Sequence, residues 1–186
     1  KNLVQKGYPL WIKGNRNRMP VGSLVAMGAT EVGSAREMAQ ACDIIHLCLS
    51  NSPQVEDVFG GPDGILAGAR DGLIVIDTTT ADPVSTAKLA EALAAKGGKL
   101  VDAPLGRTPK EAEAGTLDAM VGADEATYQH VLPVIECWAG NITHVGGPGA
   151  GHKMKLLMNF ISMGYASLYA EATVLGAAVG IPPAKV

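Results

Sequence analysis

The stretch "GGPGAGHKMKLLMN", Gly146 to Asn159, combines glycines, lysines and an asparagine at the start of a long apolar run. Such residues could bind a phosphate through a glycine-rich loop, or they could present a lysine to a reacting group. Lys155 and Asn159 are four residues apart, so a helix would place both on one face. On this spacing alone, a solvated lysine beside a capping or core asparagine remains an alternative. Lys153 fits the description of a solvated lysine better than Lys155.

The phosphate-loop interpretation fails on residue type. After the glycines, His152 and Lys153 stand where a Walker loop requires Lys followed by Ser or Thr. A dinucleotide fingerprint fails as well, because its third glycine position is His152 and the acid that follows about 20 residues later is Glu171, inside a helix. We therefore expect the glycines to let the chain turn tightly and pass close to another group, before a helix presents its first turns there.

The segments before this helix alternate between strand and helix patterns. Apolar runs such as "DIIHLCL" and "GLIVID" are typical of buried strands, and alanine-rich segments such as Asp82–Lys96 are typical of helices. The alternation predicts an α/β fold with a mostly parallel sheet and right-handed connections. From about His152 to Val179 one long helix is expected, and such a helix usually leads out of its domain. At the other end, "KNLVQKG" reads as the last turns of a helix that Gly7 terminates.

Composition excludes some classes of protein. The net charge is −3 and the basic residues are scattered, which argues against nucleic-acid binding. Only the last helical run approaches the ~20 apolar residues of a membrane span, and Lys155, Asn159 and Glu171 interrupt it, which indicates a soluble protein without membrane contact. The 3 cysteines suit neither a disulfide framework nor a zinc site. We expect no metal, and a reducing compartment, by default the cytoplasm.

Three segments together resemble the β-hydroxyacid dehydrogenase family, which includes 3-hydroxyisobutyrate dehydrogenases and tartronate semialdehyde reductases. They are "IVIDTTTADP", "VDAPLGRTPKEAEAGTLDAMVGAD" and "GGPGAGHKMKLLMNF", in the family's order and spacing. The resemblance implies a Rossmann-type, doubly wound domain over residues 1–148. It implies that residues 149–186 form an interdomain helix leading to an all-helical domain. It also implies that a first strand and a phosphate loop precede Lys1, and that most of the helical domain follows Val186.

By the same resemblance, Lys155 is the catalytic lysine and Asn159 is the amide that orients the substrate. A carbonyl that receives a hydride develops alkoxide charge, which an ammonium can stabilise and protonate. In the oxidation direction a neutral lysine would take the proton, which requires a pKa lowered by burial or by a nearby cation. The family's "K-x-x-N-N" is here "KLLMN", with Met158 at the first asparagine position and the second asparagine retained.

The substrate loop departs further from the family pattern. Many members have "DAPVSGG" where this chain has "DAPLGRT", so Gly106, Arg107 and Thr108 replace a substrate-binding serine and two glycines. A guanidinium binds a carboxylate, sulfonate or phosphate as a fork, so Arg107 predicts a small substrate with a stronger anion. The "GRT" variant is similar to that of sulfolactaldehyde reductases, which indicates 3-sulfolactaldehyde or a similar anionic semialdehyde. The alternative is a surface arginine that braces the loop.

Cofactor contacts are expected at the C-terminal strand ends, where open parallel sheets bind dinucleotides. By the resemblance they include Leu49 and Ser50 in "LCLSN" and Thr80 in "DTTT", whereas Thr78 and Thr79 fit turn positions.

The choice of dinucleotide is made at the end of the second strand, here "WIKGNRNR", with Asn15 and Arg16 as expected contacts. The segment has no acid to bind a ribose 2′-hydroxyl, and its arginines, Arg16 and Arg18, could accommodate a 2′-phosphate. NADP is therefore favoured over NAD, with an ordinary surface residue at a helix start as the alternative for Arg16.

The sequence thus predicts an NAD(P)-dependent oxidoreductase that interconverts a short 3-hydroxy acid and its semialdehyde. A homodimer or homotetramer is expected, because the long helix needs more apolar cover than one Rossmann domain provides. One alternative is a non-catalytic nucleotide-binding or interaction module on the same fold, against which the retained Lys155 and Asn159 argue. Another is an imine reductase, a class that usually replaces the catalytic lysine.

Overall fold

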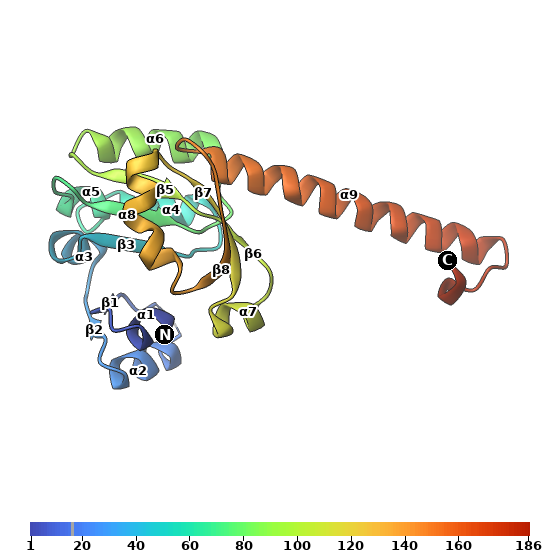
Figure 1. Cartoon of the computed structure of the whole chain (residues 1–186), viewed down its shortest axis with the longest axis horizontal. Coiled ribbons are helices and arrows are strands. Elements are labelled where there is room, and N and C mark those ends of the chain that lie inside the picture. The colour runs from blue at the N-terminus through green and yellow to red at the C-terminus, as the bar shows by residue number, and fades with distance from the viewer. Residues whose placement is uncertain (16) are drawn as a thin grey trace.

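The structure is a computed structural model that describes residues 1–15 and 17–186. Strands and helices alternate along most of the chain, as Figure 1 shows. The strands are β1 (Trp11–Ile12), β2 (Thr30–Glu31), β3 (Ile44–Leu47), β4 (Ile74–Asp77), β5 (Lys99–Asp102), β6 (Leu105–Gly106), β7 (Leu117–Gly122) and β8 (Ala139–Gly146). The helices are α1 (Asn2–Gln5), α2 (Met19–Ala26), α3 (Ala35–Ala41), α4 (Ser52–Phe59), α5 (Ile65–Gly68), α6 (Pro83–Ala94), α7 (Pro109–Ala114), α8 (Glu125–Ile135), α9 (Ala150–Ala178) and the 3-10 helix η1 (Pro183–Lys185). The predicted α/β class is confirmed.

The main sheet has the strand order β3-β4-β5-β7-β6, with β8 also paired to β7. Strands β3, β4 and β5 run parallel, and β7 runs parallel to β8 but antiparallel to β5 and β6. The expected mostly parallel sheet is therefore confirmed. Strands β1 and β2 form a separate parallel pair, in which Trp11 faces Thr30, and within the described residues no pairing joins them to β3.

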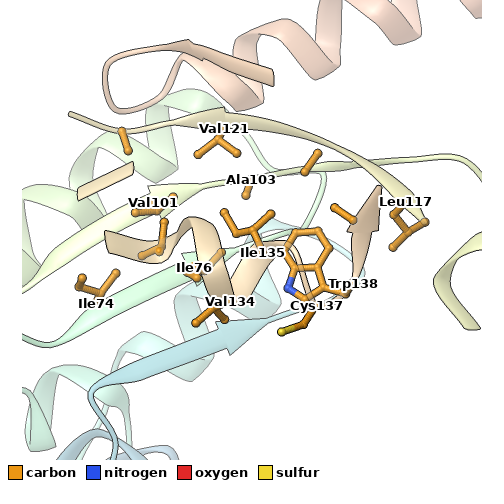
Figure 2. Packing of buried hydrophobic residues seen from close by; sticks show 14 residues of the cluster. Ile74, Ile76, Val101, Ala103, Leu117, Val121, Val134, Ile135, Cys137 and Trp138 are labelled. Carbon is orange, nitrogen blue, oxygen red and sulfur yellow. The ribbon is translucent and has the colours of Figure 1, made fainter. Parts of the chain in front are cut away.

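Apolar side chains fill both faces of the main sheet, which is what a doubly wound fold requires. Alternate residues of β4 point to opposite faces, so that Ile74 and Ile76 pack on one side and Val75 on the other. Helix α8 covers the first side, where Ile135 and Trp138 lie against the sheet residues, as Figure 2 shows. Helices α3, α4, α5 and α6 contribute to the core on the second side.

Five of the described helices begin at a polar residue whose side chain caps them. Ser34, Asn51, Asp82 and Asp124 each accept a hydrogen bond from a backbone N–H in the first turn of α3, α4, α6 and α8. Thr108 and Glu111 form a complete capping box at the start of α7. These caps explain why the helices begin where they do.

Helix α9 differs from the others in its start and its length. It has 29 residues, begins two positions earlier than predicted from the sequence and ends one earlier. Its first turns contact β5, β7 and β8, and the rest extends away from the sheet, as Figure 1 shows. Large apolar side chains such as Phe160, Met163 and Tyr169 are exposed along it. Among the described helices, none has both the length and the hydrophobicity that a membrane crossing needs.

Candidate active site

The first turns of α9 carry the two residues expected to do the chemistry. Lys155 and Asn159 are both half-buried, one helical turn apart, whereas Lys153 and Met158 are exposed. A half-buried lysine beside a half-buried amide remains accessible to a small substrate. This arrangement can direct a proton donor and an orienting hydrogen-bond donor at the same ligand.

The start of α9 is held by a residue far away in the sequence. The carboxylate of Asp102, at the end of β5, accepts the N–H of Gly149 at 2.6 Å and the N–H of His152 at 2.7 Å. Asp102 is only 1% exposed. Because the helix N-terminus carries a partial positive charge, the buried carboxylate is well matched to it. The first turn of α9 is therefore docked on the carboxyl edge of the main sheet.

A buried histidine continues this contact toward β4. Thr86 donates its hydroxyl proton to the carbonyl of Asp82 at 3.0 Å, so its oxygen accepts from Nδ1 of His152 at 2.8 Å. Nε2 of His152 has no hydrogen-bond partner among the described residues and lies 4.0 Å from Oδ2 of Asp77. Burial raises the pKa of the Asp77 carboxyl, and the hydrogen bonds from Thr79 oppose that effect.

The expected substrate loop forms β6 and the start of α7. Gly106 pairs with Asp118 of β7, and a Cβ at Gly106 would lie 3.1 Å from Cβ of Asp118. Arg107 has a left-handed backbone with φ of 77°, and its Nε donates to Oδ1 of Asp118 at 2.9 Å. Thr108 is occupied as the cap of α7, since its oxygen accepts the N–H of Lys110 at 3.3 Å. Among the described residues, no hydrogen bond joins this loop to Lys155 or Asn159.

The expected cofactor residues lie at the carboxyl ends of neighbouring strands. Thr79 Oγ1 accepts the N–H of Leu49 at 3.1 Å, and Thr78 donates to the carbonyl of Leu47 at 2.6 Å, so these two threonines tie the loops after β3 and β4 together. Thr80 and Ser50 are exposed beside them. Exposed hydroxyls on a braced carboxyl edge fit a bound dinucleotide.

The segment expected to choose between NAD and NADP follows β1. Asn15 is exposed there, and Arg16 lies outside the described residues. Arg18, the other arginine of the segment, forms a two-bond pair with Glu31, with distances of 2.7 and 2.8 Å. Arg18 is therefore engaged by a residue of β2.

Sequence reasoning did not assign functional meaning to Asp102, His152 or Asp118. Asp102 stands at the end of a buried strand inside the "DAP" segment, and that position was a usable signal. His152 and Asp118 gave no local signal, because their partners are 66 and 11 residues away. Within the part of the chain that the structure describes, no group of three His, Cys, Asp or Glu side chains is placed to hold a metal ion.

Comparison with known proteins identifies the family to which the chain belongs. Residues 1–146 match the model of the NAD binding domain of 6-phosphogluconate dehydrogenase. The chain belongs to the β-hydroxyacid dehydrogenase family. Its Rossmann-type fold and its NAD-binding domain are thereby confirmed.

Several members of the β-hydroxyacid dehydrogenase family match almost all of the chain. It is 40% identical to 2-(hydroxymethyl)glutarate dehydrogenase of Eubacterium barkeri over 98% of the chain and 60% of that protein. It is 33% identical to 3-sulfolactaldehyde reductase of Escherichia coli K12 over 97% of the chain and 60% of that protein. The structure of Mycobacterium tuberculosis 3-hydroxyisobutyrate dehydrogenase with L-serine is similar at a TM-score of 0.87 and 30% identity, over 97% of this chain and 60% of that one. The chain thus spans about three-fifths of the length of these relatives.

Proposed function

We propose that the full-length protein interconverts a short anionic 3-hydroxy acid and its semialdehyde with NAD(P). The observation that carries the proposal is the pair Lys155 and Asn159, half-buried on one face of α9 where that helix docks on the carboxyl edge of the sheet. A nicotinamide cofactor, when bound, supplies or accepts the hydride. Ser50 and Thr80 are the exposed side chains that would hold it, with the backbone around Leu49.

Lys155 moves the proton in this proposal. During reduction of an aldehyde, its ammonium stabilises the negative charge that develops on the carbonyl oxygen and then donates a proton from Nζ. In the oxidation direction, the neutral amine accepts that proton. Asn159, one turn further along α9, donates a hydrogen bond from its amide and so orients the carbon chain of the substrate.

Arg107 holds the anionic end of the substrate. Its Nε is bound by Asp118, which leaves the two terminal nitrogens of the guanidinium to form a fork with a carboxylate or a sulfonate. The side chain is 51% exposed, so a ligand can reach it. The names of two relatives, 2-(hydroxymethyl)glutarate dehydrogenase and 3-sulfolactaldehyde reductase, refer to compounds that carry a second carboxylate and a sulfonate, respectively. Both substrate types fit a guanidinium, with 3-sulfolactaldehyde as the leading candidate and Gly106 and Thr108 contributing the backbone of the loop.

The test is a rate measurement with the full-length protein. Oxidation of NADH and NADPH is followed with 3-sulfolactaldehyde, the aldehyde of 2-(hydroxymethyl)glutarate, tartronate semialdehyde and succinic semialdehyde, and in parallel with Arg107→Ser. We expect the preferred aldehyde to carry a strong second anion and the preference to disappear in the variant. Equal rates in both proteins would remove Arg107 from the site. Cofactor binding without turnover of any aldehyde would favour a non-catalytic nucleotide-binding module.

The cofactor and the assembly are part of the proposal. The absence of an acid in "WIKGNRNR" supports NADP over NAD, although the engagement of Arg18 by Glu31 leaves Arg16 as the candidate for a 2′-phosphate. Comparing the dissociation constants of NADPH and NADH decides this. The apolar side chains exposed along α9 support a homodimer or homotetramer, which light scattering of the full-length protein tests.

The proposed Rossmann unit ends at residue 148, and the helix that leads out of it begins next.

A further inference from the structure

The cap of α9 is unusual within this chain. A capping box uses two side chains, one to accept the N–H of the third helical residue and the other to accept the N–H of the capping residue. At α9 the capping residue is Gly149 and the third helical residue is His152, and a single carboxylate, that of Asp102, accepts both N–H groups. Gly149 has no side chain that could cap the helix. Asp102 therefore performs both halves of a capping box from another element.

Two glycines beside this contact, Gly122 and Gly151, have no space for a side chain. A Cβ on Gly122 would lie 2.5 Å from Oδ1 of Asp102, and a Cβ on Gly151 would lie 2.3 Å from the carbonyl oxygen of Met120. The backbone of α9 therefore touches β5 and β7 directly. A helix that packs backbone to backbone on a sheet has little freedom to shift along it.

A second contact limits rotation of the helix about this point. The imidazole of His152 is 0% exposed and is bound by Thr86 on α6, with its other nitrogen facing Asp77 at the end of β4. Asp77 and Asp102 are paired in register on neighbouring parallel strands. The first turn of α9 is thus held at two points, through its backbone by β5 and through a side chain by α6 and β4.

We infer that Asp102 is a positioning residue for Lys155, because the carboxylate that holds the N–H groups of Gly149 and His152 sets where the lysine stands at the carboxyl edge of the sheet. Lys155 follows His152 by three residues, about 4.5 Å along the helix axis at 1.5 Å per residue. A displacement of the anchored turn is therefore passed directly to Nζ. This role rests on the proposed function, whereas the anchor itself does not.

The experiment compares two carboxylates that each cap one helix. Asp102→Asn keeps the shape of the side chain but places an amide donor against a backbone donor at the start of α9. Asp124→Ala removes the carboxylate that caps α8, a helix that carries no proposed site residue. For both variants of the full-length protein we would measure kcat and KM for the aldehyde, the dissociation constant of NADPH, thermal stability, and hydrogen exchange at the amides of Gly149 and His152.

For Asp102→Asn we expect kcat to fall by on the order of 10- to 100-fold, because a displacement of about 1 Å costs that much in a positioned catalytic group. NADPH binding should stay within about twofold, since the cofactor residues lie on other loops. The backbone amides of Gly149 and His152 should exchange their hydrogens faster than in the wild type. In Asp124→Ala, stability should fall while kcat is retained.

Several results would overturn the inference. One is a kcat in Asp102→Asn that falls no further than in Asp124→Ala. Another is rapid exchange of the Gly149 and His152 amides in the wild-type protein, a result that needs no variant to fold. Turnover of no aldehyde by the wild-type protein, with these amides protected, would remove the proposed function and the positioning role together while leaving the anchor in place.

Discussion

The guanidinium of Arg107 and the carboxylate of Asp118 form an ion pair across β6 and β7, with Nε 2.9 Å from Oδ1, while the backbone of Arg107 has a left-handed φ of 77°. A residue with a side chain pays about 1–2 kcal/mol for that conformation, which glycine adopts freely. The backbone conformation therefore favours glycine at this position, yet the residue is an arginine, whose side chain is paired with Asp118.

Replacing Arg107 with glycine should separate stability from substrate binding. We expect the free energy of unfolding of Arg107→Gly to stay the same or to rise by up to about 1 kcal/mol, because the relieved backbone strain outweighs an exposed ion pair. KM for the anionic aldehyde should rise about tenfold or more, because a charge-assisted fork is lost. Denaturant unfolding and steady-state kinetics measure the two effects. Arg107→Lys, which keeps the charge without the fork, is the control, and an unchanged KM in the glycine variant would contradict the anchor role.

Lys155→Ala should remove catalysis with little effect on cofactor binding. We expect kcat to fall by about 10²-fold or more, as for loss of a positioned acid or base, while the dissociation constant of NADPH is retained. The matched control is Lys153→Ala, on the same helix but exposed, which should keep most of kcat. If the two variants were equally active, the proton would have to come from another group.

Gly151→Ala should disturb the seat of α9. The added Cβ would lie 2.3 Å from the carbonyl oxygen of Met120 and 2.7 Å from that of Asp102, and neither backbone atom can rotate away. We expect a loss of about 1–3 kcal/mol in the free energy of unfolding, as for overpacking elsewhere, together with a lower kcat. Gly147→Ala, with no atom within 4 Å of the new Cβ, provides the comparison and should be near neutral. Equal stability of the two variants would show that α9 can shift.

His46 should make stability depend on pH. Burial lowers its pKa to about 4, and its Nε2 has no partner among the described residues. The unfolded chain, in which the pKa is about 6.5, binds the proton first, so the stabilising contribution is complete above pH ~6.5 and is lost as the pH falls toward 4. The loss amounts to about 3 kcal/mol at most. In His46→Phe this contribution to the loss of stability between about pH 6.5 and pH 4 should be absent, so the stability curve of the variant should fall less steeply than that of the wild type; parallel curves for both proteins would place the titration elsewhere.

Much of the fold could be predicted from the sequence because strands and helices have local signals. The run "GLIVID" and the Asp82-Pro83 helix start correspond to β4 and α6, and α1 ends at Gln5, two residues before Gly7, which adopts φ of 86°. Three short elements, α5, β6 and α7, were not expected. For α7 a signal existed, since Thr108, Pro109 and Glu111 spell a capping box with proline at the first position.

The site was less predictable because its geometry depends on residues that are distant in sequence. The spacing of Lys155 and Asn159 could be read from the chain, but the contact of Asp102 with Gly149 spans 47 residues. The glycines were expected to allow a close approach, and the structure identifies what they approach, the ends of β5 and β7. Thr108 was expected to bind substrate, but its hydroxyl oxygen accepts a hydrogen bond from Lys110 and caps α7.

The length of α9 makes its anchored turn a pivot. At 1.5 Å per residue, the 29 residues of the helix reach about 43 Å. A tilt of about 5° at Asp102 would move Lys155 by only about 0.7 Å but would move the far end of the helix by about 4 Å. The same tilt therefore displaces the far end of the helix roughly six times as far as it displaces Lys155. The position of the far end of α9 therefore depends more strongly on the carboxylate of Asp102 and the glycines at the base of the helix than the position of Lys155 does.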